Sequence, residues 1–206
     1  MLRKLAKQAA IRAVHARNER DRQRLGLDGR TMPPQAWGFD TGPSGHLTVD
    51  GCDVAELAQR FGTPLHVVGR TQLERTYRRF LSSFTAHYPR VEIGYSYKTN
   101  PLPGVVRVLH ELGACAEVIS HFELWLAMAL GVPPERIIFN GPAKTPDSLA
   151  LAVSRGIRLI NIDNADEIDA IARLAQARGR TQQVGVRVVT SVGWSSQFGL
   201  GIANGE

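Results

Sequence analysis

The segment VEIGYSYKTN, residues 91–100, predicts a β-strand that stops before Pro101. Side chains alternate between the two faces of a strand, so Gly94, Ser96 and Lys98 share one face, which carries only small side chains before the lysine. An amine above small residues and enclosed by protein can lose its proton and attack a carbonyl. The pattern favours a lysine that forms a Schiff base. A solvated lysine that closes an edge strand has the same local sequence and stays open as the alternative.

After Asn100 the chain alternates apolar strand-like runs with amphipathic helical stretches. We expect strands at 114–120, 136–140, 158–163 and 184–190, and helices at 105–112, 122–130, 146–155 and 165–178. Each helical stretch is followed by a glycine that can adopt the left-handed cap conformation, at Gly113, Gly131, Gly156 and Gly179. Strands that alternate with single helices at this spacing indicate parallel βα units, in a doubly wound sheet or a (β/α)8 barrel.

Two of these helices begin with the spacing of a capping box. Ser120 precedes Glu123 by three residues, and Asn164 precedes Glu167 by three. In each pair the first side-chain oxygen can accept a free amide of the first helical turn. These polar residues therefore have a structural role available.

Two charged residues inside predicted strands favour the barrel over the open sheet. Glu117 and Arg187 each interrupt an otherwise apolar run, and burying such charges is costly unless they are paired or bind a ligand. A barrel lumen near its mouth offers both possibilities. Polar residues also gather at the carboxyl ends of the predicted strands, where barrels of this kind carry their active sites. These residues are Lys98, Ser120, Asn140 and Asp163. A structural ion pair between Glu117 and Arg187, with the strand-end residues acting as helix caps, is the alternative.

Several short motifs then occur in a fixed order. They are YSYKTN at 95–100, LG at 112–113 with EVIS at 117–120, GVPPERIIF at 131–139, NIDN at 161–164, VRV at 186–188 and FG at 198–199. With these motifs the chain, from about Pro64 onward, resembles the fold-type III pyridoxal-phosphate decarboxylases. That family includes diaminopimelate, ornithine and arginine decarboxylases and is related to alanine racemase.

The resemblance implies roles for three residues. Lys98 would carry pyridoxal 5′-phosphate as a Schiff base, and Arg187 would lie near the phenolic oxygen of this cofactor. Glu117 would contact the cofactor or Arg187, although it replaces the aspartate usual in the family. Gln197 stands where many members have a lysine, which leaves any intersubunit salt bridge there without its usual cation.

The resemblance also implies a function. We expect α-decarboxylation of a basic or diamino acid, with diaminopimelate as the preferred single substrate, by a homodimer. An amino-acid racemase on the same barrel and a non-catalytic pyridoxal-phosphate-binding or regulatory relative are the alternatives. The family's phosphate-binding loop and Cys-Glu segment do not occur in these 206 residues, and a full barrel needs roughly 250. We therefore expect the N-terminal part of a (β/α)8 barrel, without its C-terminal β domain.

Three regions are predicted. Residues 1–45 form a basic helical extension and linker, 46–70 form a leading-strand region that pairs with the later β domain, and 71–206 form the partial cofactor-binding barrel. Residues 1–24 contribute most of the net charge of +6.

Cys52 and Cys115 lack metal-ligand spacing and are expected to be reduced. No stretch is apolar enough to span a membrane, so we expect a cytoplasmic protein that binds a small amino acid and neither nucleic acid nor metal.

Overall fold

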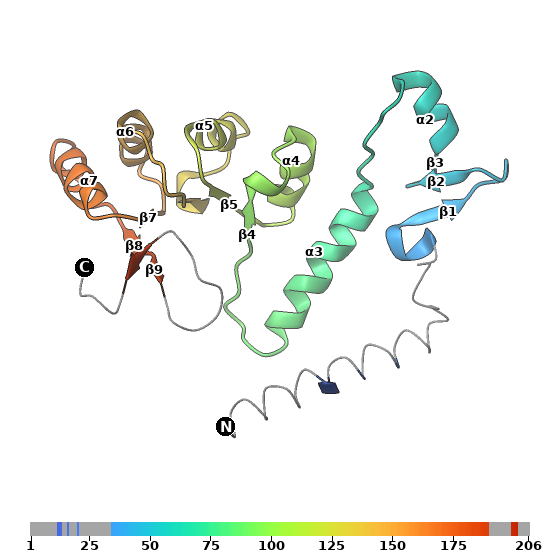
Figure 1. The fold of residues 1–206 in the computed structure, drawn as a ribbon, viewed down its shortest axis with the longest axis horizontal. Helices are drawn as coiled ribbons and strands as arrows, with labels where there is room; N and C mark the ends of the chain where they lie inside the picture. The colour runs from blue at the N-terminus through green and yellow to red at the C-terminus, as the bar shows by residue number, and fades with distance from the viewer. Residues whose placement is uncertain (1–11, 14–15, 17–19, 21–33, 190–198, 202–206) are drawn as a thin grey trace. The chain divides into compact units, whose positions relative to one another are not determined.

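The computed structural model describes residues 12–13, 16, 20, 34–189 and 199–201 (Figure 1). Contacts divide the chain into two compact units, Met1–Gln72 and Leu73–Glu206. Most of the predicted basic extension lies outside the described residues. Each unit is described below by itself.

The first unit contains a small antiparallel sheet that runs from the predicted linker into the predicted leading-strand region. It comprises η1 (Pro34–Trp37), β1 (Phe39–Thr41), β2 (Leu47–Val49), β3 (Cys52–Asp53) and α2 (Val54–Phe61), with strand order β1-β2-β3. Asp50 and Gly51 both have positive φ, 48° and 79°, which is the two-residue hairpin turn that joins β2 to β3. Residues 65–69 carry no strand in the described part of the chain, so the predicted pairing of a leading strand stays a prediction.

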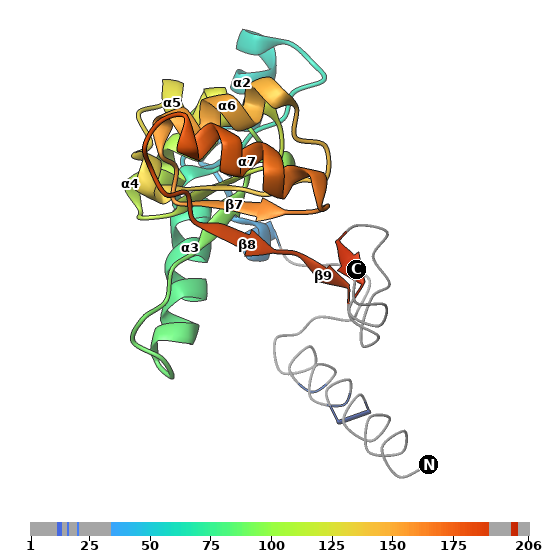
Figure 2. The same cartoon turned by 90° about the vertical axis from the view of Figure 1, so that its left-hand side faces the viewer.

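The second unit is a series of parallel βα units, as predicted. It contains α3 (Arg70–Thr85), β4 (Gly94–Ser96), η2 (Tyr97–Thr99), α4 (Pro103–Glu111), β5 (Cys115–Val118), α5 (His121–Ala129), η3 (Pro134–Arg136), β6 (Ile137–Phe139), α6 (Pro146–Arg155), β7 (Leu159–Ile162), α7 (Asp166–Gln176), β8 (Val184–Val186), β9 (Val188–Val189) and β10 (Leu200–Gly201). The main sheet has the order β4-β5-β6-β7-β8, and β9 pairs separately with β10. Helices α4 to α7 lie on one side of the main sheet (Figures 1 and 2). The four predicted cap glycines all have positive φ.

Successive side chains of the strands point to opposite faces of the main sheet, and one of these faces is apolar while the other carries polar side chains. The face toward the helices is fully or almost fully buried and forms the core with residues of α4 to α7; its strand residues are Ala116, Val118, Ile137, Phe139, Ile160 and Ile162. On the opposite face Ser96 is paired with Glu117, and Glu117 with Ile138. The sheet therefore presents its interior polar side chains away from the helices.

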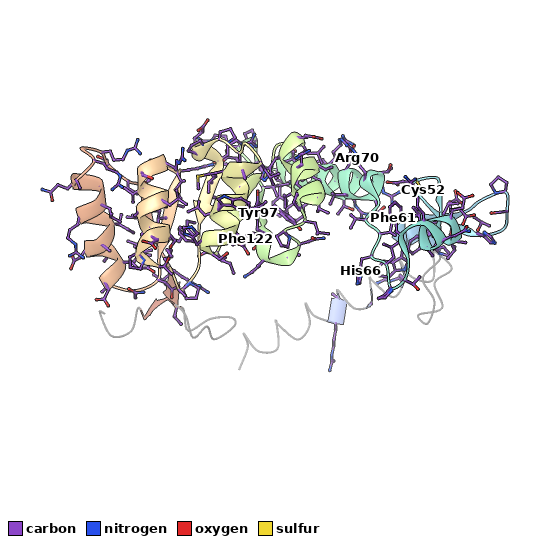
Figure 3. All side chains as sticks on the ribbon, turned by 90° about the horizontal axis from the view of Figure 1, so that it is seen from above. Cys52, Phe61, His66, Arg70, Tyr97 and Phe122 are labelled. Carbon is purple, nitrogen blue, oxygen red and sulfur yellow. The ribbon has the colours of Figure 1, made fainter. Side chains whose placement is uncertain are left out.

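The first strand is shorter than predicted, and Lys98 does not lie within it. β4 ends at Ser96, and Lys98 lies in the short 3-10 turn η2 that follows. Tyr97, labelled in Figure 3, is fully buried. Its hydroxyl lies 2.6 Å from His110 Nε2 on α4. The chain thus leaves the sheet after Ser96, and Tyr97, the residue before Lys98, contacts α4.

The last predicted strand is also different, because it is interrupted at Arg187. β8 and β9 flank this residue and belong to different sheets. We expected helices to cover the side chains of Val184, Val186 and Val188, but these are 45%, 58% and 49% exposed. In the described part of the chain β8 is an edge strand, and no described helix follows it to cover this face.

Candidate cofactor site

Lys98 presents an available amine beside the carboxyl end of β4. Its side chain is exposed, and no hydrogen bond or ion pair among the described residues engages it. An amine that acts as a nucleophile must be reachable and must not be fixed in a structural ion pair. Lys98 meets both requirements.

Ser96 and Glu117, on the same face of the sheet, each contain a buried oxygen without a partner. They are directly opposed in the β4–β5 register, and neither Ser96 Oγ nor Glu117 Oε1 has a hydrogen-bond partner within the described chain. Leaving a buried polar group unsatisfied costs about 1–3 kcal/mol. Two such atoms side by side near a free lysine are suited to a polar ligand, so the residues present fit a cofactor bound at this face.

Glu123 connects this region to the start of α5. Its Oε2 accepts the amide of Ile119 at 2.8 Å, while its own amide donates to Ser120 Oγ at 3.2 Å, which confirms the predicted cap. Burial raises the pKa of the Glu123 carboxyl, and the negative charge of Glu117 raises it further; the Ile119 amide and the positive charge of Lys98 lower it. The charges of Glu117 and Lys98 therefore shift the pKa of the Glu123 carboxyl in opposite directions.

Arg187 pairs with a different acid from the one we expected. Its Nη1 lies 3.1 Å from Asp163 Oδ1, at the end of the neighbouring strand β7, and it forms no ion pair with Glu117. The alternative of a structural ion pair between Arg187 and Glu117 is therefore wrong, whereas the closeness of the two residues stays a prediction. β5 and β8 are separated by β6 and β7, so Glu117 and Arg187 lie on strands that are not adjacent.

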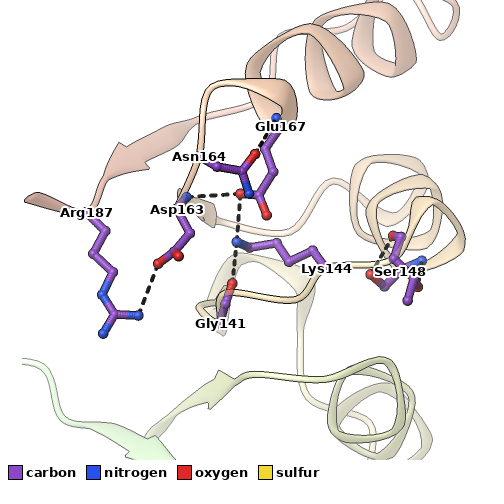
Figure 4. Close-up of polar contacts among 8 residues, drawn as sticks. Gly141, Lys144, Ser148, Asp163, Asn164, Glu167 and Arg187 are labelled. Atoms are coloured by element: carbon purple, nitrogen blue, oxygen red, sulfur yellow. Dashed lines mark hydrogen bonds and ion pairs between the residues drawn. The ribbon is translucent and has the colours of Figure 1, made fainter. Parts of the chain in front are cut away.

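Sequence reasoning missed a buried ion pair between Lys144 and Glu167 (Figure 4). The Lys144 side chain is fully buried, and its Nζ donates to Glu167 Oε2 at 2.9 Å and to the Gly141 carbonyl at 2.6 Å. Glu167 also forms the second predicted cap, because its amide donates to Asn164 Oδ1 at 3.2 Å. The sequence showed the two partners separately, Lys144 within GPAKTP at 141–146 and Glu167 in a predicted cap, and nothing in it indicated that they pair.

Comparison with known proteins identifies the family. The family model described as pyridoxal-dependent decarboxylase, pyridoxal binding domain, matches residues 70–199. The chain belongs to this family. The βα series and the lysine face described above therefore lie within a pyridoxal-binding decarboxylase domain, and its cofactor is pyridoxal phosphate.

Curated relatives of this decarboxylase domain agree with the family model. The diaminopimelate decarboxylase of Methanocaldococcus jannaschii is 34% identical over 152 residues, which are 72% of this chain and 35% of the relative. The diaminopimelate decarboxylase of Aquifex aeolicus is 36% identical over 144 residues, which are 70% of this chain and 33% of the relative. The chain thus spans about a third of the length of the curated relatives it matches.

Solved structures show the same fold. Diaminopimelate decarboxylase from M. jannaschii in complex with L-lysine aligns with a TM-score of 0.73 and 30% identity, over 81% of this chain and 42% of that one. Lysine decarboxylase from Selenomonas ruminantium aligns with a TM-score of 0.62 and 28% identity, over 73% of this chain and 39% of that one. The prediction of a partial (β/α)8 barrel of the decarboxylase type is confirmed.

The described residues contain neither a metal-binding cluster nor a candidate membrane span. Among them, no group of three His, Cys, Asp or Glu side chains could hold a metal ion. None of the described helices combines the length and the apolar character needed to cross a membrane. Cys52 and Cys115 are both free thiols.

Proposed function

We propose that this chain is the pyridoxal-binding part of an amino-acid decarboxylase that acts on diaminopimelate or another basic amino acid, with Lys98 as the residue that carries the cofactor. The proposal rests on the Lys98 amine and the nearby oxygens of Ser96 and Glu117, none of which has a partner among the described residues. The names of the curated relatives support diaminopimelate as the substrate. The complex of one structural relative with L-lysine is consistent with a basic amino acid at this site.

The chemistry is divided between the cofactor and the chain. Pyridoxal phosphate, when bound, supplies an electron sink for the electrons left behind when the α-carboxylate departs as carbon dioxide. Lys98 supplies the amine that attaches the cofactor to the protein. Lys98 would hold the cofactor through its Nζ, and the same nitrogen would carry a proton when it is not bound to the cofactor.

Glu117 and Arg187 have supporting roles in this proposal. The unpartnered Oε1 of Glu117 offers an acceptor on the face where Lys98 stands. Arg187, held by Asp163 at the end of β7, offers a cation that stabilises an anionic oxygen of the cofactor. In this arrangement Glu117 and Arg187 act on the cofactor separately, because they form no ion pair with each other.

We also propose the organisation of the remaining parts. Residues 46–70 would pair with a later β domain, and this is supported by the exposed apolar side chains of Leu65, Val67 and Val68, which have no strand partner among the described residues. Residues 1–45 would be an extension and 71–206 the partial barrel. The protein would act as a homodimer in the cytoplasm and would bind no nucleic acid.

The function can be tested directly with the full-length protein loaded with pyridoxal phosphate. Carbon dioxide release should be measured with meso-diaminopimelate, L-lysine, L-ornithine and L-arginine, and configurational inversion with alanine. Release from a basic or diamino acid that is lost in Lys98→Ala would support the proposal. Inversion without release would instead identify a racemase. Cofactor binding without either reaction would identify a non-catalytic relative.

A further inference from the structure

Lys144 and Glu167 form a fully satisfied charge pair away from Lys98. Lys144 is completely buried and Glu167 is 6% exposed, and the Lys144 ammonium makes two hydrogen bonds. A buried pair of this kind contributes little net stability compared with apolar side chains of similar shape, whereas removing one partner is costly. Stability alone therefore gives a weak reason for this pair.

The pair connects the ends of three neighbouring strands. Gly141 lies in the loop after β6 and has φ of 127°; a Cβ at this position would lie 2.6 Å from the Ile119 carbonyl oxygen, at the end of β5. Lys144 holds this close loop by its bond to the Gly141 carbonyl. Glu167, from α7, accepts the amide of Asp163 at 3.0 Å, just after β7.

The same carboxylate oxygen extends the connection toward Arg187. Glu167 Oε2 accepts both Lys144 Nζ and the Asp163 amide, and Asp163 Oδ1 lies 3.1 Å from Arg187 Nη1 (Figure 4). Glu167 therefore fixes the backbone of Asp163, which pairs with Arg187. Lys144 in turn fixes the Glu167 carboxylate.

The cap formed by Glu167 does not itself require a lysine. Glu123 occupies the equivalent position, five residues after the end of its strand, and its Oε2 accepts the amide of Ile119 in the same way. No lysine hydrogen-bonds Glu123 among the described residues. The lysine is therefore an addition at one of two equivalent caps, and that cap is the one that leads to Arg187.

We propose that Lys144 and Glu167 are positioning residues that hold Arg187 on the cofactor-facing edge of the sheet, acting through Asp163. This inference rests on the role proposed above for Arg187. Neither residue contacts the cofactor in this scheme. Their effect is to fix the direction of the Asp163 carboxylate, and through it the place of the Arg187 guanidinium.

The experiment compares two double variants of the full-length protein. Lys144→Met/Glu167→Gln removes both charges and keeps an acceptor for the Asp163 amide. Lys144→Met/Glu167→Met removes both charges and that acceptor. The dissociation constant for pyridoxal phosphate and the pH dependence of its absorption band are measured for both, together with the melting temperature of the cofactor-free proteins.

Positioning predicts that the two doubles differ in cofactor binding. The variant with methionine at 167 should bind pyridoxal phosphate roughly tenfold or more weakly than the wild type, as is typical when the support of a ligand-binding residue is removed. The variant with glutamine should bind clearly more tightly than its counterpart. In an Arg187→Met background the two doubles should bind equally, because the residue on which they act has been removed.

Other outcomes overturn the inference in distinguishable ways. If Arg187→Met weakens binding but the two doubles bind equally, the pair is only structural and the inference alone fails. If Arg187→Met binds like the wild type, the role proposed for Arg187 fails and the inference fails with it. If the methionine double does not fold, Asp163→Asn tests the last link: it should weaken binding as much as Arg187→Met, and unchanged affinity would refute the inference. Glu74→Gln/Arg78→Met, in an exposed ion pair on α3, is the matched control.

Discussion

Ser96 and Glu117 lie directly opposite each other on neighbouring strands, and each holds a buried oxygen that no described residue satisfies. Native structures rarely leave such atoms unpaired, because the lost hydrogen bond is not replaced by water. Both atoms lie on the sheet face away from the helices, near the end of β4 where Lys98 follows. We infer that these two unsatisfied oxygens reduce the stability of the cofactor-free fold and are available to bind a ligand.

Replacing Ser96 by alanine should separate stability from ligand binding. Ser96→Ala removes the unsatisfied hydroxyl, so the cofactor-free protein should be as stable as the wild type or more stable, by up to about 1–3 kcal/mol. The same variant should bind pyridoxal phosphate more weakly. Thermal unfolding without cofactor and titration with cofactor measure the two effects. A loss of stability with unchanged affinity would show that Ser96 is only a structural residue.

Reductive labelling should find the cofactor on Lys98. Borohydride treatment of the loaded full-length protein, followed by peptide mapping, should place the phosphopyridoxyl group on Lys98 and leave Lys144 unmodified. The Lys144 side chain is fully buried and donates two hydrogen bonds, whereas Lys98 is exposed and has no hydrogen bond or ion pair with any described residue. A label on Lys144 would contradict the site assignment.

The matching substitution gives the control. Lys98→Ala should abolish turnover, and its melting temperature without cofactor should stay close to that of the wild type, because the exposed side chain packs little apolar surface. A large loss of stability in Lys98→Ala would mean that the lysine has a structural role instead.

Local signals in the sequence predicted the βα series and the caps, because both depend on short spacings. Ser120 with Glu123, and Asn164 with Glu167, form the expected bonds three residues apart. These contacts are set by helix geometry alone, so a sequence is enough to find them. The cap glycines were predictable for the same reason.

Contacts between strands were not predictable in the same way. Arg187 was expected to meet Glu117, but the structure brings Asp163 to it from the adjacent strand. The sequence offers several acids at strand ends, and only strand order and register decide which of them lies nearest. The 23 residues that separate Lys144 from Glu167 hid that pair for the same reason.

The pKa of Glu123 makes a prediction about pH. Burial, followed by the charge of Glu117, raises this pKa above its ordinary value of 4.5 in the folded protein. The protonated carboxyl is therefore favoured by folding: its stabilising contribution is present below pH 4.5 and is lost as the pH rises through the higher, folded-state pKa. Glu123→Gln keeps an acceptor for Ile119, so it should be more stable than the wild type at neutral pH. This advantage should shrink toward pH 4.5, as urea unfolding at several pH values can show; an advantage that grows on acidification would contradict it.

The contact between Arg187 and Asp163 can be measured by a double-mutant cycle. Asp163 is mostly buried while Arg187 is one-third exposed, so Arg187→Met should destabilise the fold by about 1–3 kcal/mol, because it leaves a buried carboxylate without this cation. Asp163→Asn/Arg187→Met should recover much of that loss but should not recover cofactor affinity. Glu117→Gln/Arg187→Met should recover no stability, since Glu117 forms no ion pair with Arg187 within the described part of the chain. If Glu117→Gln instead recovered the stability lost in Arg187→Met, that result would indicate an ion pair between Glu117 and Arg187 and contradict the structure.

The exposed face of β8 predicts the behaviour of residues 1–206 when they are expressed alone. Val184 and Val186 are each about half exposed on β8, the last strand of the main sheet, which has no neighbour beyond it among the described residues (Figure 2). Val188, in β9 just after it, is exposed to a similar degree. An apolar edge strand of this kind is a template for pairing with another chain, so we expect this polypeptide to self-associate at micromolar concentration. Val186→Lys should reduce the association because it places a charge in the middle of the exposed face. Gln183→Lys adds the same charge outside that face and should have little effect. Sedimentation velocity of the three proteins measures the difference, and equal association in all three would show that the β8 face is not the contact.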